Sequence, residues 1–234
     1  MSTWQNLIKE RQPDLRTIEE IRQVLAFPDC QYSSPLYEMY RDLAPDELSH
    51  QWLQDNYLRY DITKIPAASI CGEYVKTKGH YHPAAPDGSA YPEIYEVLMG
   101  TAQYLIQKEN LSSVILIQAK KGDTVIIPPE YGHVTINPER GDLVMANVVS
   151  DRFSSSYSMY ETMKGAAYYL YDDGTIQKNP SYPDIPPLLI LDADDINVSD
   201  TLPDGPLLDY IGDEKRFSFL NHPKNYPELL TLFT

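Results

Sequence analysis

Three of the five histidines in this chain stand in patterns that could bind a metal ion. His80 and His82 are separated by one residue, so in an extended strand their side chains would point to the same face. Glu93 opens an apolar run, and His133 follows the turn signal Pro128–Gly132. Imidazole and carboxylate groups together suit Fe(II), Mn, Ni, Zn or Co. Three imidazoles and one carboxylate, delivered by neighbouring strands, would therefore form a mononuclear metal site.

Such a ligand set also limits the geometry of the metal. Four protein ligands on an octahedral ion leave two positions for water or substrate, whereas a tetrahedral zinc would have none. The competing interpretation is a surface strand with two solvated histidines, but burying two imidazoles on one face is expensive unless they share a partner. The other two histidines, His50 and His222, have no such context, and we expect them to be structural or surface residues.

A region of short β-branched and aromatic runs surrounds the candidate ligands. Turn signals rich in glycine, proline and aspartate separate these runs. Many short strands at this spacing indicate an antiparallel sandwich or barrel. The expected strands are Tyr57–Thr63, Ser69–Lys76, Glu93–Met99, Thr101–Lys108, Ser113–Ala119, Thr124–Ile127, Val134–Asn137, Leu143–Val149 and Ala167–Tyr171.

The two flanks of this region differ from it in composition. The N-terminal flank is expected to be mostly helical, with one strand at Leu36–Tyr40. The capping-box pattern Thr17–Glu20 begins one helix, Pro28 ends it, and a second short helix is expected at Asp46–Leu53. The C-terminal flank is acidic, and prolines break up its apolar segments. It either packs along the barrel or a partner subunit, or is partly ordered. The expected parts are an N-terminal segment (1–56), a barrel (57–180) and an extension (181–234).

The charge of the chain excludes some classes of partner. Its 234 residues have a formal net charge of −15, whereas phosphate surfaces attract stripes of lysine and arginine. We therefore expect neither nucleic acid nor a membrane surface as a partner, although a small phosphorylated substrate needs only a local pocket of donors. The N-terminus is polar, and no apolar run approaches the ~20 residues of a membrane span. A cytoplasmic protein is expected.

The cysteine content agrees with that location. Cys30 and Cys71 are too few for a disulfide framework. The pattern allows a single bridge, but two reduced thiols are the simpler expectation.

Three segments together resemble the two motifs of the cupin family. They are Gly79–Pro83, Glu93–Gly100 and Val125–His133. More narrowly, Thr77–His82 joined to Glu93–Leu98 resembles the cupin-type glucose-6-phosphate isomerases of archaea and some bacteria. The resemblance covers about residues 34–180. It implies a mainly β fold, the cupin double-stranded β-helix or jelly-roll barrel, here flanked by the N-terminal helices and the proline-rich extension.

The resemblance also implies roles for individual residues. One divalent metal ion per subunit, usually iron or manganese, would be bound by His80, His82, Glu93 and His133. The phosphate and the sugar hydroxyls would be contacted by Thr63, Thr77, Gly79 and Tyr95, and Tyr157 is the nearest candidate for a further tyrosine of the site. A homodimer is implied as well, with Leu36–Tyr40 as our candidate for its contact.

The activity that the resemblance implies is the interconversion of glucose 6-phosphate and fructose 6-phosphate. A divalent metal can polarise the carbonyl of an open-chain sugar, and a nearby carboxylate could move the proton between adjacent carbons. Glu93 and Tyr95 are the expected catalytic residues, with Glu93 as both ligand and base. Because metal binding lowers the basicity of a carboxylate, two mechanisms stay open, namely proton transfer through a cis-enediol and a metal-assisted hydride shift.

Two other functions fit the same ligands. Another metal-dependent cupin enzyme, such as a non-haem iron dioxygenase, would take up oxygen with a small organic substrate. A non-catalytic cupin would bind a sugar or a metal without turnover.

The segment around the paired histidines contains a geometric conflict. In one regular strand Thr77 and Gly79 would face away from His80 and His82. A bulge or bend at Gly79 would remove the conflict, because glycine tolerates the backbone that this requires.

Overall fold

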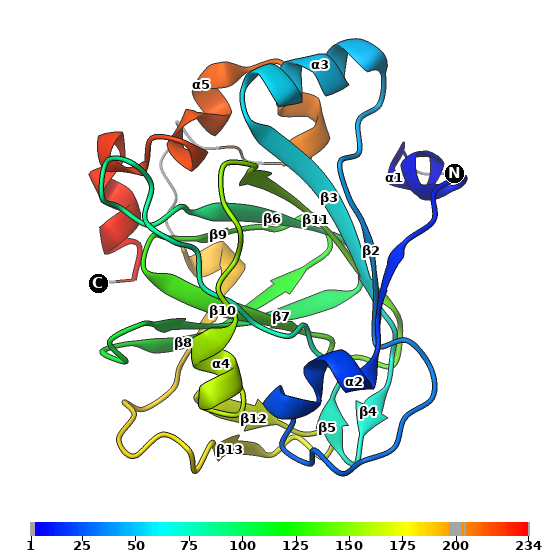
Figure 1. The fold of residues 1–234 in the computed structure, drawn as a ribbon, viewed down its shortest axis with the longest axis vertical. Coiled ribbons are helices and arrows are strands. Elements are labelled where there is room, and N and C mark those ends of the chain that lie inside the picture. The colour runs from blue at the N-terminus through cyan, green and yellow to red at the C-terminus, as the bar shows by residue number, and fades with distance from the viewer. Residues whose placement is uncertain (1–2, 197–202, 204, 234) are drawn as a thin grey trace.

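The computed structural model describes residues 3–196, 203 and 205–233, and its centre is a barrel of two facing sheets (Figure 1). The larger sheet has the strand order β1-β2-β3-β11-β6-β9, and the smaller one has the order β10-β7-β8-β14. All pairs are antiparallel except β8 with β14. Strands that are distant in the sequence are thus neighbours in space, as in a jelly roll. The mainly β, cupin-type barrel that the sequence predicts is confirmed.

The strands have the following bounds. The larger sheet consists of β1 (Asp14–Arg16), β2 (Tyr37–Tyr40), β3 (Leu58–Ile65), β11 (Leu143–Ser150), β6 (Glu93–Met99) and β9 (Thr124–Ile127). The smaller sheet consists of β10 (Tyr131–Ile136), β7 (Thr101–Lys108), β8 (Val114–Lys120) and β14 (Leu189–Asp192). Two small hairpins are formed by β4 (Ser69–Ile70) with β5 (Glu73–Tyr74) and by β12 (Tyr168–Leu170) with β13 (Ile176–Lys178).

One predicted strand is wrong. The run Ser69–Lys76 is not a continuous strand but the hairpin of β4 and β5. Cys71 and Gly72 form its turn with φ values of 50° and 92°. Two successive residues with positive φ reverse the chain, and an isolated apolar run in the sequence does not reveal this.

The helices are short and lie around the barrel (Figure 1). They are α1 (Thr3–Ile8), α2 (Ile18–Ile21), α3 (Glu47–Asp55), α4 (Ser158–Thr162) and α5 (Glu214–Phe217). Single 3₁₀ turns are η1 (Arg22–Val24), η2 (Ala193–Asp195), η3 (Leu207–Tyr210), η4 (Ser218–Leu220), η5 (Pro223–Asn225) and η6 (Pro227–Thr231).

The predicted helix starts follow from their caps. At α2 the carboxylate of Glu20 accepts the backbone N–H of Thr17 at 2.8 Å, as a capping box requires. At α3 the side chain of Asp46 accepts the backbone N–H of Ser49 at 2.8 Å. The N-terminal segment departs from prediction in three respects. It contains a second strand, β1, which pairs with β2, and a further helix, α1, and the helix expected to end at Pro28 ends at Ile21 and continues only as η1.

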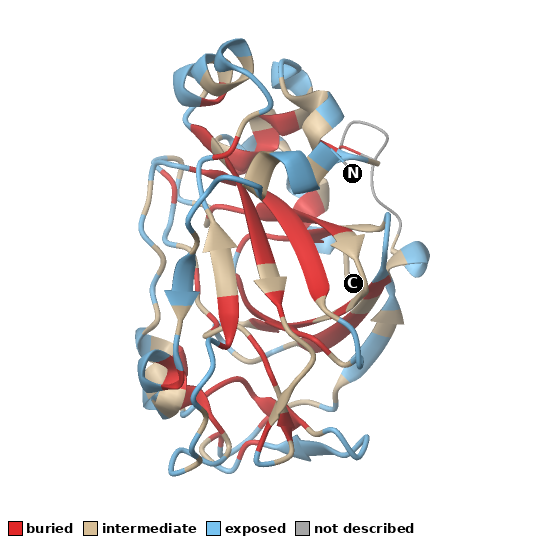
Figure 2. Cartoon of the chain, turned by 90° about the vertical axis from the view of Figure 1, so that its right-hand side faces the viewer, coloured by how far each residue is buried: buried red, intermediate tan, exposed pale blue. Residues whose placement is uncertain are grey.

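The larger sheet is covered on both faces. Its outer face packs against α3 and the C-terminal extension, where Ile62 and Val148 of the sheet join Leu53, Phe217 and Phe219 in one buried cluster. Figure 2 shows the central strands as the buried part of the molecule. Every residue of β11 is buried, since a strand covered on both faces has no solvent side. The described part of the extension therefore lies along the barrel.

The prediction of reduced cysteines is wrong. Cys30 and Cys71 form a disulfide bond that ties the loop before β2 to the turn between β4 and β5. Hydrogen bonds hold the same loop. The carbonyl of Cys30 accepts from the Arg22 guanidinium at 3.0 Å, and the backbone N–H of Ala26 donates to the Glu73 carboxylate at 2.8 Å. Because 41 positions separate the two cysteines, only the fold brings them together.

Reduction of this disulfide is expected to lower the free energy of unfolding by about 4 kcal/mol, since the bridge restricts a long loop of the unfolded chain. Denaturant titration with and without reductant measures the change. The Cys30→Ser/Cys71→Ser variant is the control, because reductant should not change its unfolding midpoint. An unchanged midpoint in the fully reduced wild-type protein, with thiol alkylation proving reduction, would contradict the expectation.

Strand β2 cannot pair with a second subunit through its backbone, because it lies between β1 and β3. The segment Leu36–Tyr40, our candidate for a dimer contact, is therefore inside a sheet rather than at its edge.

In the described part of the chain, no helix combines the length and apolar character needed to span a bilayer.

Candidate metal centre and substrate pocket

The four side chains predicted as metal ligands, His80, His82, Glu93 and His133, converge on one point. Their ligand atoms all lie within 4.8 Å of one another. His80 Nε2 is 3.1 Å from His82 Nε2, and Glu93 Oε2 is 3.4 Å from His82 Nε2 and 3.3 Å from His133 Nε2. Glu93 Oε2 is buried, and none of the described residues donates a hydrogen bond to it. A buried carboxylate oxygen without a hydrogen-bond partner, facing imidazole nitrogens, fits a divalent cation.

Contacts behind these side chains fix their orientation. His82 Nδ1 lies 2.9 Å from the carbonyl oxygen of Tyr91, so a proton on Nδ1 leaves Nε2 free for a metal. The ring of Phe153 packs 4.4 Å from that of His82 and stacks on Tyr91. The amide Nδ2 of Asn147 donates to Glu93 Oε1 at 2.7 Å. Two of the four ligands are thus held by a second layer of contacts.

The electrostatics of the cluster favour a bound cation. Burial lowers the pKa of His80 well below its ordinary value, and the neighbouring His133 and His82 lower it further. Burial also lowers the pKa of His133. Burial by itself would raise the pKa of Glu93, but the close imidazoles of His133 and His82 hold that pKa well below its ordinary value. Neutral imidazoles at His80 and His133 and an ionised carboxylate at Glu93 are the protonation states that a metal ion requires.

The segment that carries His80 and His82 is irregular. Single bridges connect it to the barrel, where His80 pairs with His133 and Tyr81 pairs with Ser156. Gly79 has a φ of 79°, which confirms the bend that the sequence predicts at this residue. The bend allows residues on both sides of Gly79 to line one pocket.

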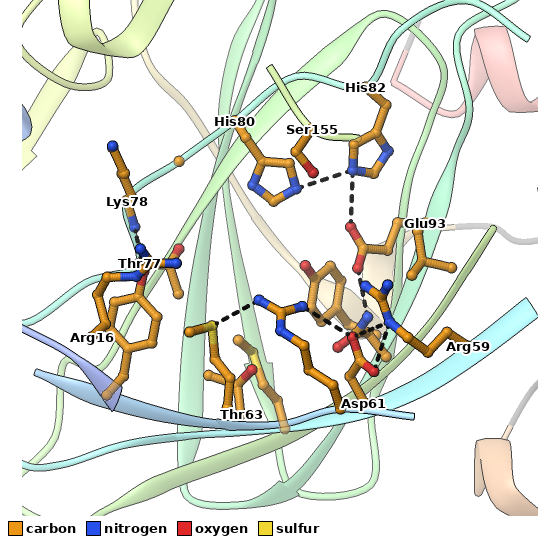
Figure 3. Close-up of a pocket in the computed structure, with 18 of the residues that line it drawn as sticks. Arg16, Arg59, Asp61, Thr63, Thr77, Lys78, His80, His82, Glu93 and Ser155 are labelled. Atoms are coloured by element: carbon orange, nitrogen blue, oxygen red, sulfur yellow. Dashed lines mark hydrogen bonds and ion pairs between the residues drawn. The ribbon is translucent and has the colours of Figure 1, made fainter. Parts of the chain in front are cut away.

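Three of the four candidate ligands, His80, His82 and Glu93, line that pocket, as Figure 3 shows. The predicted substrate contacts Thr63, Thr77, Gly79 and Tyr95 all line it, and so does Tyr157. The hydroxyl oxygen of Thr77 accepts the backbone N–H of Thr135 at 2.9 Å, so its own proton is free to donate to a ligand. The buried hydroxyl of Tyr95 is 2.9 Å from His133 Nε2, and burial raises the pKa of Tyr95 well above its ordinary value. Tyr95 therefore keeps its proton.

A cationic end of the pocket includes one residue that the sequence analysis missed. The Arg16 guanidinium lies 5.9 Å from the ring centre of Tyr37, and Lys78 Nζ lies 5.0 Å from that of Tyr157. Arg16 Nε is buried without a hydrogen-bond partner among the described residues, whereas Nη1 of the same guanidinium donates to Glu20 at 3.0 Å. Arg16 belongs to β1, the strand that the sequence did not predict, and no local signal marks it as a pocket residue.

A second charged group at the pocket was missed although the sequence contains a signal for it. Alternation along the predicted strand Tyr57–Thr63 places Arg59, Asp61 and Thr63 on one face. Asp61 accepts from Arg59 Nε at 2.8 Å and from the backbone N–H of Asp42 at 2.9 Å. Burial raises the pKa of Asp61, although Arg59 opposes the change.

The two histidines predicted to be structural lie elsewhere. His50 contacts Asp42 at 3.0 Å, and His222 precedes η5. Neither belongs to the metal-ligand cluster found among the described residues.

Comparison with known proteins gives one family match. A family model described as Glucose-6-phosphate isomerase (GPI) matches residues 11–186. No curated protein matches the sequence.

Comparison with solved structures gives distant likenesses. An oxalate oxidase in complex with the substrate analogue glycolate is 16% identical with a TM-score of 0.41, and the match covers 53% of this chain and 57% of that chain. The oxalate decarboxylase of Lactobacillus farciminis is 17% identical with a TM-score of 0.39, covering 54% of this chain and 32% of that one. Vicilin from Capsicum annuum is 13% identical with a TM-score of 0.37, covering 54% and 30%. This chain spans less than two thirds of the length of each.

Proposed function

The chain belongs to the glucose-6-phosphate isomerase family, and we propose that it interconverts glucose 6-phosphate and fructose 6-phosphate in the pocket beside its metal-ligand cluster. The observation that carries this proposal is the convergence of His80, His82, Glu93 and His133, with the buried Glu93 Oε2 facing imidazole nitrogens and lacking a hydrogen-bond partner among the described residues. The family match includes all four residues.

The bound ion is proposed to be one Fe(II) or Mn(II) per subunit, held by the four residues of the cluster. Nickel, zinc and cobalt also suit imidazole and carboxylate ligands. When bound, the ion would polarise the carbonyl of the open-chain sugar.

The two ends of the pocket are proposed to bind different parts of the substrate, the phosphate at one end and the reacting carbons at the other. Thr63, Thr77 and the backbone of Gly79 offer donors to the phosphate, and Lys78 and Arg16 supply positive charge. A phosphate at this end directs the reacting carbons toward the four ligands. There the protonated hydroxyl of Tyr95 can donate a hydrogen bond to a sugar oxygen. Glu93 could move a proton only through a carboxylate oxygen that Asn147 and the metal leave free.

The two mechanisms left open by the sequence can be separated by isotope labelling. Loss of deuterium from C2 of the substrate to solvent would support proton transfer through a cis-enediol with Glu93. Complete retention would support a hydride shift. The hydrogen bond from Asn147 to Glu93 Oε1 occupies one of the two carboxylate oxygens, which weakens the case for Glu93 as the base.

The proposed function is tested by metal analysis coupled to an isomerase assay. Interconversion of the two sugar phosphates should be lost on chelation and should return when Fe²⁺ or Mn²⁺ is added. Metal binding without interconversion would favour a non-catalytic binding protein. Oxygen uptake with a small organic substrate would favour a dioxygenase.

Thr77→Val is expected to raise KM for fructose 6-phosphate by about tenfold, because one charge-assisted hydrogen bond to the phosphate is lost. Metal content should be unchanged. Thr77→Ser is the matched control, since it keeps the hydroxyl that donates to the phosphate and accepts from Thr135. Steady-state kinetics with phosphorylated and free sugar decides the role, and equal losses for both substrates would argue against it.

A homodimer and a cytoplasmic location remain proposals. The disulfide between Cys30 and Cys71 weighs against a reducing compartment, where such bridges are rare. Thiol alkylation of the protein in intact cells would show whether the bridge exists there.

A further inference from the structure

The two carboxylate oxygens of Glu93 have different surroundings. Oε1 accepts a hydrogen bond from the side-chain amide of Asn147 at 2.7 Å. Oε2 accepts no hydrogen bond within the described part of the chain and faces His82 and His133 at 3.4 and 3.3 Å. One oxygen is therefore bound to the protein, and the other is presented to the metal position.

Asn147 is placed for this contact by the larger sheet. It lies in the middle of β11, opposite Tyr95 of β6 on one side and opposite Asp61 of β3 on the other. Only 6% of its surface is exposed, so water does not compete for its amide protons. Glu93 is also buried, with 4% exposed. A hydrogen bond between two buried groups, one of them ionised, is among the stronger ones in a protein.

The number of metal positions taken by Glu93 determines how many are left for substrate. Three imidazoles and one carboxylate oxygen occupy four positions of an octahedral ion and leave two. A carboxylate that binds through both oxygens would occupy a fifth position and leave one. A substrate with oxygens on adjacent carbons needs two positions to bind through both.

We propose that Asn147 is a positioning residue that keeps Glu93 a one-oxygen ligand and thereby leaves two metal positions open for a substrate that binds through two oxygens. This inference rests on the proposed metal site. It does not require that the reaction be an isomerisation.

Asn147→Leu tests the inference because leucine has a similar size and no donor. The variant and the wild-type protein are loaded with Co²⁺, and two small ligands are titrated while the visible spectrum of the cobalt is recorded. Azide occupies one metal position, whereas acetohydroxamate binds through two oxygens. Asn147→Leu should weaken acetohydroxamate binding at least about tenfold, the loss of one charge-assisted hydrogen bond, and leave azide binding within about twofold.

Two further variants separate positioning from a general effect on the fold. Asn147→Asp has the same shape but places a like charge beside Glu93, and it should lose acetohydroxamate binding in the same way. Met145→Leu is the control. Met145 lies two residues earlier on the same face of β11, and its sulfur accepts from the hydroxyl of Tyr104 and does not contact Glu93. Replacing methionine by leucine changes the side-chain volume little. This variant should bind both ligands as the wild type does.

Two results would overturn the proposal. The first is that both Asn147 variants bind acetohydroxamate as tightly as the wild type does, or that they lose affinity for azide and acetohydroxamate equally. The other needs no variant, since a wild-type Co²⁺ site that binds azide but has no room for acetohydroxamate contradicts two open positions. Because none of these measurements uses isomerase turnover, a failure of the proposed activity would be seen separately.

Discussion

Glu93→Gln is expected to abolish metal binding and to lower kcat/KM for fructose 6-phosphate by a factor on the order of 10³, which corresponds to several kcal/mol of lost stabilisation. Glu93 is the one carboxylate among the four candidate ligands, and its Oε2 accepts no hydrogen bond from any residue that the structure describes. A neutral amide would remove the negative charge that balances a divalent ion among neutral imidazoles.

Glu96→Gln is the matched control for this substitution. Glu96 belongs to the same strand, β6, but its carboxylate accepts the backbone N–H of Leu207 at 2.8 Å on the outer side of the sheet. A glutamine at 96 can still accept that hydrogen bond, so metal content and kinetics should stay close to those of the wild type. Metal analysis and steady-state kinetics of both variants measure the difference. A Glu93→Gln protein that keeps its metal and its rate would show that the ion is bound elsewhere.

Gly79→Ala is expected to lower the free energy of unfolding by about 3 kcal/mol and to reduce metal content with it. A side chain at φ = 79° is strained in itself. The added Cβ would also lie 2.6 Å from Val134 Cγ2 and 2.9 Å from the ring of Tyr160, and such overpacking costs a further ~1–3 kcal/mol. His80 follows directly, so a shift of the backbone here would displace the first of the four ligands.

Gly88→Ala separates the two contributions to this cost. Gly88 also has a positive φ, 93°, but nothing lies within 4 Å of a Cβ built there. Its substitution should cost only the backbone strain, about 1 kcal/mol, and should leave the metal in place. Denaturant titrations of both variants measure the difference. Equal losses of stability would mean that contacts with Val134 and Tyr160 do not constrain the segment.

The metal-ligand cluster could be predicted from sequence because its signal is local. The spacing of His80 and His82, and the motif-like segments that contain Glu93 and His133, carry the resemblance without any knowledge of strand order. The bend at Gly79 could be predicted as well, since it follows from a conflict between strand geometry and the faces on which Thr77 and His80 must lie.

The residues that were missed depend on pairing between distant segments. Arg16 reaches the pocket because β1 pairs with β2, and a three-residue strand is too short for its sequence to predict that pairing. Asn147 contacts Glu93 because β11 pairs with β6 in one register, and a shift by one residue would turn its side chain to the other face. The bridge between Cys30 and Cys71 likewise depends on the hairpin of β4 and β5.

The outer face of the larger sheet has a consequence for synthesis of the chain. Phe217, Phe219, Leu220 and Leu229, which help to cover that face, are added after every strand of the barrel has been made. Until then the sheet exposes an apolar surface, and each of these side chains is worth ~1.5–3 kcal/mol when buried. A barrel made without these residues would therefore keep this apolar face in contact with water.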